Sequence, residues 1–186
     1  MSVQLLRRAF AVEEYRKMGE AGIFKEGERV ELIRGEIIQM SPIGTRHSAA
    51  VNRLVRLFTQ HLGSRIILSP QNPVELDNNS EPQPDIALLL PRQDFYEYRH
   101  PIPQDVLLLV EVADTTAKYD REVKIPLYAE DNITEVWLVD INEQCIEVYR
   151  QPSPDGYQNV QKLGRGQTLS ILAFREVNIG VNEVLG

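Results

Sequence analysis

The stretch VLLLVEVA at residues 106–113 combines an unbroken apolar run with a single carboxylate, Glu111. A short aliphatic run bounded by polar segments is typical of a strand that is buried on both faces of a sheet. An unpaired charge in such a strand is very costly, so the carboxylate must be neutralised or must meet a cation. We therefore expect a buried strand here and treat Glu111 as a candidate functional residue.

The segments around this strand alternate between helical and extended patterns. Residues 10–21, 45–62 and 117–130 have the apolar spacing or composition of helices. Strands are predicted at 65–76, 84–90, 106–113, 134–140, 145–150 and 157–163, and a hairpin at 29–40 that turns at Arg34-Gly35. The predicted fold class is α/β or α+β, with a mixed β-sheet flanked by helices; the pattern alone does not separate the two.

Length and composition indicate one hydrophobic core. A chain of 186 residues with 42% hydrophobic content fits a single domain over 1–186, with its central part at about 25–150. The one cysteine, Cys145, excludes an intramolecular disulfide. The first residues lack the apolar stretch of a secretory signal, and no run is long enough for a membrane span. We expect a soluble, cytoplasmic protein without membrane contact.

Charge is unevenly distributed along the chain. Residues 1–70 hold 11 Lys and Arg against 7 Asp and Glu, whereas residues 71–186 hold 9 against 20, and the formal net charge is -7. This asymmetry permits a basic face for a polyanion beside an acidic pocket for a metal ion. Ordinary surface solvation explains it equally well.

A second candidate carboxylate, Asp85, opens the predicted strand 84–90 directly after Pro84. Because proline lacks a backbone donor, the first residue of this strand is expected at the end of the sheet, where it can meet solvent. Two carboxylates on neighbouring strands would repel one another, raise a pKa or share a hard divalent cation such as Mg²⁺, Mn²⁺ or Ca²⁺. This reading requires the two strands to pair.

Three residues of the predicted helix 117–130, Asp120, Lys124 and Tyr128, are spaced by four and share a face. Pro126 lies between them and is expected to kink the helix or to mark its first turn. A lysine here could orient the attacking water or stabilise charge on a phosphate oxygen. The alternative is an exposed Asp120–Lys124 ion pair worth about a few tenths of a kcal/mol, with Tyr128 as packing.

The order of these motifs, Pro84-Asp85, Glu111-Val112-Ala113 and the segment DREVK at 120–124, resembles the PD-(D/E)XK nuclease superfamily. More closely, GEIIQMSPIGTRH, QPDIALLL, LLVEVADTTAKYDREVKIPLYA and TEVWLVD together resemble the Uma2 family of restriction endonucleases. The superfamily has a lysine two residues after the glutamate, and this chain has Ala113 there. The Uma2 resemblance places the lysine at Lys124 instead; Lys118 ranks below it because it falls in the link before the helix.

This resemblance implies roles for the aligned residues. Asp85 and Glu111 would ligate Mg²⁺ or Mn²⁺, with the backbone carbonyl of Val112 as a further ligand. Lys124 would act on the water that attacks the phosphate. The chain would then be a metal-dependent endonuclease that hydrolyses DNA.

Further residues match less specific positions of the family. His47, at the start of the helix 45–62, would contact the scissile phosphate or the attacking water; a hydrogen-bonded core histidine is the alternative. Glu31 and Asp120 would be accessory acidic residues, although an exposed hairpin glutamate is the ordinary case for Glu31. On the other side of the helix 45–62, Arg46, Arg53 and Arg56 could contact phosphates or could simply be solvated.

Two other classes of function stay open. A nucleic-acid-binding or protein-interaction module with a nuclease-like fold would agree with the acidic composition, because nonspecific DNA binders gain affinity from positive charge. A structural carboxylate cluster would bind no ion at all. If the chain cuts both strands of DNA, two active sites are needed, and a homodimer is then expected.

Overall fold

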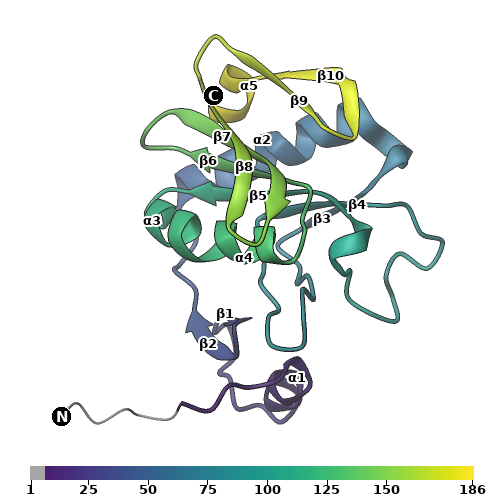
Figure 1. Ribbon diagram of the computed structural model, residues 1–186, viewed down its shortest axis with the longest axis vertical. Coiled ribbons are helices and arrows are strands. Elements are labelled where there is room, and N and C mark those ends of the chain that lie inside the picture. Colours follow the sequence, from purple (N-terminus) through teal and green to yellow (C-terminus); the bar gives the residue numbers. More distant parts are fainter. Residues whose placement is uncertain (1–6) are drawn as a thin grey trace.

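A six-stranded mixed sheet forms the centre of the computed structural model, which describes residues 7–186 (Figure 1). Neighbouring strands pair antiparallel except β5 and β6, which are parallel. The prediction of a mixed sheet flanked by helices is therefore confirmed. In spatial order, the strands are β3 (Ile67–Pro70), β4 (Ile86–Leu89), β5 (Val106–Ala113), β6 (Glu135–Asp140), β7 (Cys145–Ser153) and β8 (Gly156–Gly164).

Helices cover both faces of this sheet. On one face lies α2 (Thr45–Leu62), which is followed by a short 3₁₀ turn, η1 (Gly63–Arg65). On the other lie α3 (Ala117–Tyr119), a π-helical turn, η3 (Asp120–Lys124), and α4 (Ile125–Glu130). Since side chains alternate along a strand, Val110 and Val112 join the core under α2, whereas Leu109 and Ala113 join the core under α4. By the same alternation Glu111 lies on the α4 face.

The predicted helix 117–130 forms, but a π-turn interrupts it. The Ile125 N–H donates to the Asp120 carbonyl, five residues back. Pro126 follows at the start of α4, and its ring and missing N–H are incompatible with a continuous α-helical ladder. The wider turn relieves that conflict. Such π-bulges are frequent at functional sites.

The predicted strand 65–76 is too long. Strand β3 ends at Pro70, and Gln71 adopts a left-handed backbone conformation with φ 54°. The Gln71 N–H donates to the carbonyl of Asp85, so the chain leaves the sheet beside the start of β4. The apolar residues Val74 and Leu76 are buried outside the sheet, so their alternation in the sequence resembles that of a strand.

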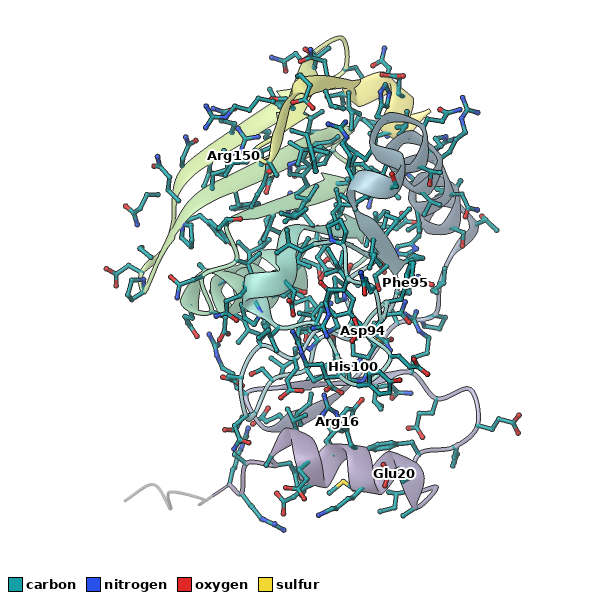
Figure 2. All side chains as sticks on the ribbon, turned by 90° about the vertical axis from the view of Figure 1, so that its right-hand side faces the viewer. Arg16, Glu20, Asp94, Phe95, His100 and Arg150 are labelled. Atoms are coloured by element: carbon teal, nitrogen blue, oxygen red, sulfur yellow. The ribbon has the colours of Figure 1, made fainter. Side chains whose placement is uncertain are left out.

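The loop before β5 contains a 3₁₀ turn, η2 (Pro103–Asp105), and carries Asp94, Phe95 and His100 (Figure 2).

The N-terminal elements lie at one end of the molecule, beyond the large sheet (Figure 1). They are α1 (Val12–Glu20) and the hairpin of β1 (Val30–Ile33) and β2 (Glu36–Gln39). Arg34 and Gly35 both have positive φ angles, 49° and 77°, which is the geometry of a tight type I′ hairpin turn. The predicted hairpin is confirmed.

Polar contacts fix these elements to the rest of the chain. Arg16 of α1 pairs with Glu75 at 2.6 Å and also with the buried Glu81, and Figure 2 shows Arg16 on the side of α1 that faces the remainder of the molecule. Arg34 at the hairpin turn pairs with Glu130 at the end of α4 at 2.6 Å. The hairpin turn is thereby linked to the end of α4, the helix that directly follows Lys124.

The C-terminal segment adds a second layer on the α2 side. It consists of β9 (Thr168–Ile171), β10 (Phe174–Gly180) and α5 (Val181–Leu185), and its apolar residues join the same core as α2. Sequence patterns did not predict these elements. None of the helices among residues 7–186 has the length and apolarity needed to cross a membrane.

Candidate active site

A pocket of about 630 Å³ lies between the β1–β2 hairpin, the end of β5 and the segment 114–124. Every residue that the sequence predicted for the site lines this pocket: Glu31, His47, Asp85, Glu111, Val112, Asp120 and Lys124. These residues come from five separate parts of the chain. The fold thus brings the whole predicted set together, and their chemical roles are considered below.

Lys124 connects two glutamates at the floor of the pocket. Its Nζ lies 3.0 Å from Glu111 Oε1 and 3.1 Å from Glu31 Oε2, and each of the three side chains is at most 4% exposed. The alternative of an exposed Asp120–Lys124 pair is therefore wrong, since Asp120 and Lys124 are both buried. The alternative of an exposed hairpin glutamate is also wrong for Glu31.

Asp85 lies one residue before β4, and β4 pairs with β5 as the two-carboxylate hypothesis required. Its Oδ2 accepts a hydrogen bond of 2.8 Å from the backbone N–H of Val112. Its Oδ1 lies 2.9 Å from Nε2 of His47. Asp85 is thus held by the strand that carries Glu111 and by the first turn of α2.

His47 differs from a fully hydrogen-bonded core histidine. While Nε2 faces Asp85, the buried Nδ1 has no hydrogen-bond partner among residues 7–186. The side chain is 14% exposed and reaches the pocket from the α2 side of the sheet, opposite to Lys124. His47 thus contacts Asp85 from the α2 side of the sheet, whereas Lys124 contacts Glu31 and Glu111 from the other side.

Two tyrosines also contact the carboxylates. Tyr128 donates a 2.5 Å hydrogen bond to Glu111 Oε1, and Tyr119 donates one of 3.3 Å to Glu31 Oε1. The backbone N–H of Gln83 adds a 3.0 Å bond to Glu31 Oε2. Sequence reasoning assigned Tyr128 to packing; its spacing of four from Lys124 was the available signal for a polar role.

Negative charge exceeds positive charge in this cluster. Four buried carboxylates, Glu31, Asp85, Glu111 and Asp120, surround one buried lysine. Burial raises the pKa of Glu111 to about 8 and that of Asp120 to about 6, against the opposing charge of Lys124. Burial would lower the pKa of Lys124, but Glu111 and Glu31 outweigh it and hold that pKa above its ordinary value.

This excess of carboxylate oxygens fits a hard divalent cation. Carboxylate and carbonyl oxygens are the preferred ligands of Mg²⁺ and Mn²⁺. Both contacts to Glu111, from Tyr128 and from Lys124, reach Oε1. Among residues 7–186, Oε2 of Glu111 accepts no hydrogen bond, which leaves it available to a cation in the pocket.

A second group of potential metal ligands, in another part of the molecule, has no such excess of negative charge. The ligand atoms of Glu143, Cys145 and Glu147 lie within 4.8 Å of one another. However, Glu147 pairs with Arg121 at 2.9 Å, and Glu143 pairs with Lys162. Because cations of the chain already neutralise both carboxylates, the charge imbalance that marks the pocket is absent here.

The basic residues of α2 are partly engaged in the fold. Arg46 pairs with Asp114 at 3.0 Å, and Arg53 donates to the carbonyl of Leu185 at 3.1 Å. Arg56 is exposed. Phosphate contacts by these arginines stay a prediction. Lys118 lies at the pocket edge with its side chain 85% exposed.

Comparison with known proteins adds two findings. The model of the family described as "Uma2: Putative restriction endonuclease" matches residues 12–182. A crystal structure described as "a putative nuclease belonging to DUF820 from Anabaena variabilis ATCC 29413" is similar with a TM-score of 0.72 and 18% identity, over 95% of this chain and 97% of that chain. No curated protein matches the chain. The structural likeness shows a shared fold.

Proposed function

Because this chain belongs to the Uma2 family of restriction-endonuclease-like proteins, we propose that it is a Mg²⁺-dependent endonuclease that hydrolyses phosphodiester bonds in DNA. The observation that carries this proposal is the cluster of four buried carboxylates around Lys124 at the floor of the pocket. A surplus of buried negative charge destabilises a fold unless a cation offsets it. The presence of such a surplus in this pocket therefore favours a functional site.

Asp85 and Glu111 would hold Mg²⁺ or Mn²⁺, and the Val112 carbonyl is the further ligand that the family resemblance implies. When bound, the ion would polarise the phosphate and lower the pKa of the attacking water. The hydrogen bonds from Val112 N–H and Tyr128 O–H to these carboxylates would orient them. Hydrogen bonds that orient metal-ligating side chains in this way raise the affinity of a site for its metal ion.

Lys124 would act as a hydrogen-bond donor and a positive charge. Since its pKa is raised, the amine stays protonated at neutral pH and is unsuited to accept a proton from water. A protonated lysine can orient the attacking water and stabilise negative charge that develops on the phosphate oxygens. Glu31, the second carboxylate in contact with Lys124, would fix the ammonium group, and Asp120 would add to the negative potential there.

His47 would complete the site from the α2 side. Its contact with Asp85 orients the ring, and the side chain lines the pocket, where it would contact the phosphate or the attacking water. Imidazole commonly serves such roles because its pKa lies close to neutrality. Under this proposal, His47 would contact the scissile phosphate or the attacking water.

A DNA-cleavage assay tests the proposal. Supercoiled plasmid and linear DNA would be incubated with the wild type, Lys124→Ala and Lys118→Ala, with Mg²⁺ or Mn²⁺ and separately with a chelator. We expect metal-dependent cleavage by the wild type and Lys118→Ala, and at least about a 100-fold loss in Lys124→Ala. Cleavage that persists in the chelator, or in Lys124→Ala at the wild-type rate, would contradict the mechanism.

The rival is a non-catalytic nucleic-acid-binding or protein-interaction module. The net charge of -7 favours it, because such a chain gains little from nonspecific attraction to phosphates. It predicts no cleavage under any metal condition.

Double-strand cleavage by the proposed endonuclease would call for a homodimer, which sedimentation of the active protein would test.

A further inference from the structure

One face of the β1–β2 hairpin forms a wall of the pocket. The strand register pairs Glu31 with Ile38, and the Met40 N–H donates to the Arg29 carbonyl one step further along the ladder. Because side chains alternate along each strand, Arg29 and Glu31 share this face with Ile38 and Met40. All four residues line the pocket. We call them the hairpin wall.

Within the hairpin wall, Arg29 is a cation without an acidic partner. Glu31 is engaged by Lys124, and no ion pair to Arg29 is present among residues 7–186. The residue is partly buried at the wall of the pocket, and its guanidinium has no protein anion within ion-pair distance among the described residues. A guanidinium binds phosphate through two parallel hydrogen bonds, which makes a phosphate group its natural partner.

The other half of the hairpin wall is apolar. Ile38 and Met40 are half-buried, and the following segment extends this surface with Pro42 and with Ile43, which is 41% exposed. The apolar surface would suit the sugar and base of one nucleotide, and the guanidinium would suit its phosphate. Both features lie beside the carboxylate cluster. The pocket volume of about 630 Å³ lies within the range of small-molecule sites.

We propose that the hairpin wall is a subsite for one unpaired nucleotide, with Arg29 on its phosphate and with Ile38 and Met40 against its sugar and base. The substrate is then single-stranded DNA, or DNA in which a nucleotide has left the stack. This inference rests on the proposed function, since it places the bound strand beside the carboxylates.

Binding rather than cleavage tests this inference, so its failure is distinct from failure of the nuclease proposal. Fluorescence anisotropy would measure binding of a labelled 12-nucleotide single strand and of the matched duplex, in low salt with Ca²⁺ to limit hydrolysis. The proteins are the wild type, Arg29→Ala and Met40→Ala. Arg175→Ala is the control for loss of an exposed positive charge, and Met18→Ala for a half-buried methionine away from the pocket.

We expect the wild type to bind the single strand at least about ten-fold more tightly than the duplex. Arg29→Ala should weaken single-strand binding by about ten-fold and Met40→Ala by several-fold, whereas both controls should bind like the wild type. Equal or tighter binding of the duplex, no binding of either DNA, or equal effects of Arg29→Ala and Arg175→Ala would each overturn the inference. Cleavage-deficient protein with the expected binding pattern would overturn only the nuclease proposal.

Discussion

Lys124 Nζ lies 3.0 Å from Glu111 Oε1, although the lysine belongs to the helical layer and the glutamate to the sheet. The residue two positions after Glu111 is Ala113, so the strand itself supplies no lysine there. The π-turn at Asp120–Lys124 brings the ammonium group to Glu111 from the helical layer. The buried ion pair is thus built from two elements of the fold.

Replacing Lys124 by methionine should destabilise the protein. The substitution leaves Glu31 and Glu111 buried without their cation, and loss of one partner of a buried pair typically costs about 3–5 kcal/mol. Urea unfolding at pH 8 measures the effect, with Lys118→Met as the exposed control, for which a change below about 0.5 kcal/mol is expected. Equal stability of the two variants would mean that Lys124 is not a buried counterion.

Replacing Tyr128 by phenylalanine should alter both stability and Mn²⁺ affinity. The lost hydroxyl donates to Glu111 Oε1, which keeps its contact with Lys124, and one hydrogen bond to an acidic group contributes about 1.5–3 kcal/mol. Tyr157→Phe is a control, because it removes the hydroxyl of a partly buried tyrosine that donates to the Ile133 carbonyl instead. Calorimetric Mn²⁺ titration should show weaker binding only in Tyr128→Phe; unchanged affinity there would remove its orienting role.

Stability without metal should fall as the pH rises from about 4.5 to about 8. Burial raises the pKa of Glu111 to about 8 in the folded state, from an ordinary value of 4.5. A group with a raised folded pKa contributes its full stability below the unfolded pKa, and this contribution is lost as the pH rises through the folded pKa. Comparison of urea unfolding between pH 4.5 and 8.5 should show this decline flattened in Glu111→Gln. The same slope in both proteins would exclude Glu111 as its source.

Replacing Gly35 by alanine should disturb the hairpin that carries Glu31. Gly35 has φ 77°, and a Cβ there would lie 2.5 Å from the Cβ of Ala9. Gly22→Ala is the control for backbone strain alone, since Gly22 has φ 69° and open space around it. Strain of this type costs about 1 kcal/mol, and the clash should add to it in Gly35→Ala. Thermal unfolding compares the two, and equal effects would show that the hairpin shifts without cost.

Much of this arrangement could be predicted from local patterns. The apolar run with an embedded carboxylate predicted β5 and Glu111, and the spacing of four placed Lys124 and Tyr128 on the helix face that is buried. Both patterns depend on fixed periodicities of strand and helix. The sequence left open whether β4 pairs with β5, as the two-carboxylate hypothesis requires, and the structure shows that pairing.

Other features depend on contacts between segments far apart in sequence. Glu31 is buried against residues far away in the sequence, with contacts from Lys124 and from the backbone N–H of Gln83, which no local pattern encodes. The early end of β3 results from the left-handed turn at Gln71 and its bond to Asp85. Strands β9 and β10 form a separate two-stranded sheet, and their apolar residues pack into the same core as α2, a long-range contact that no local pattern encodes.

Thermal unfolding with and without Mg²⁺ tests the central claim of a cation site at the carboxylate cluster most directly. A ligand that binds only the folded state raises its stability, so the melting temperature of the wild type should rise with Mg²⁺ concentration. Glu111→Gln keeps the size of the side chain but removes its charge, and its melting temperature should not respond. An equal rise in both proteins would place the ion elsewhere, and no rise in the wild type at millimolar Mg²⁺ or Mn²⁺ would contradict the account.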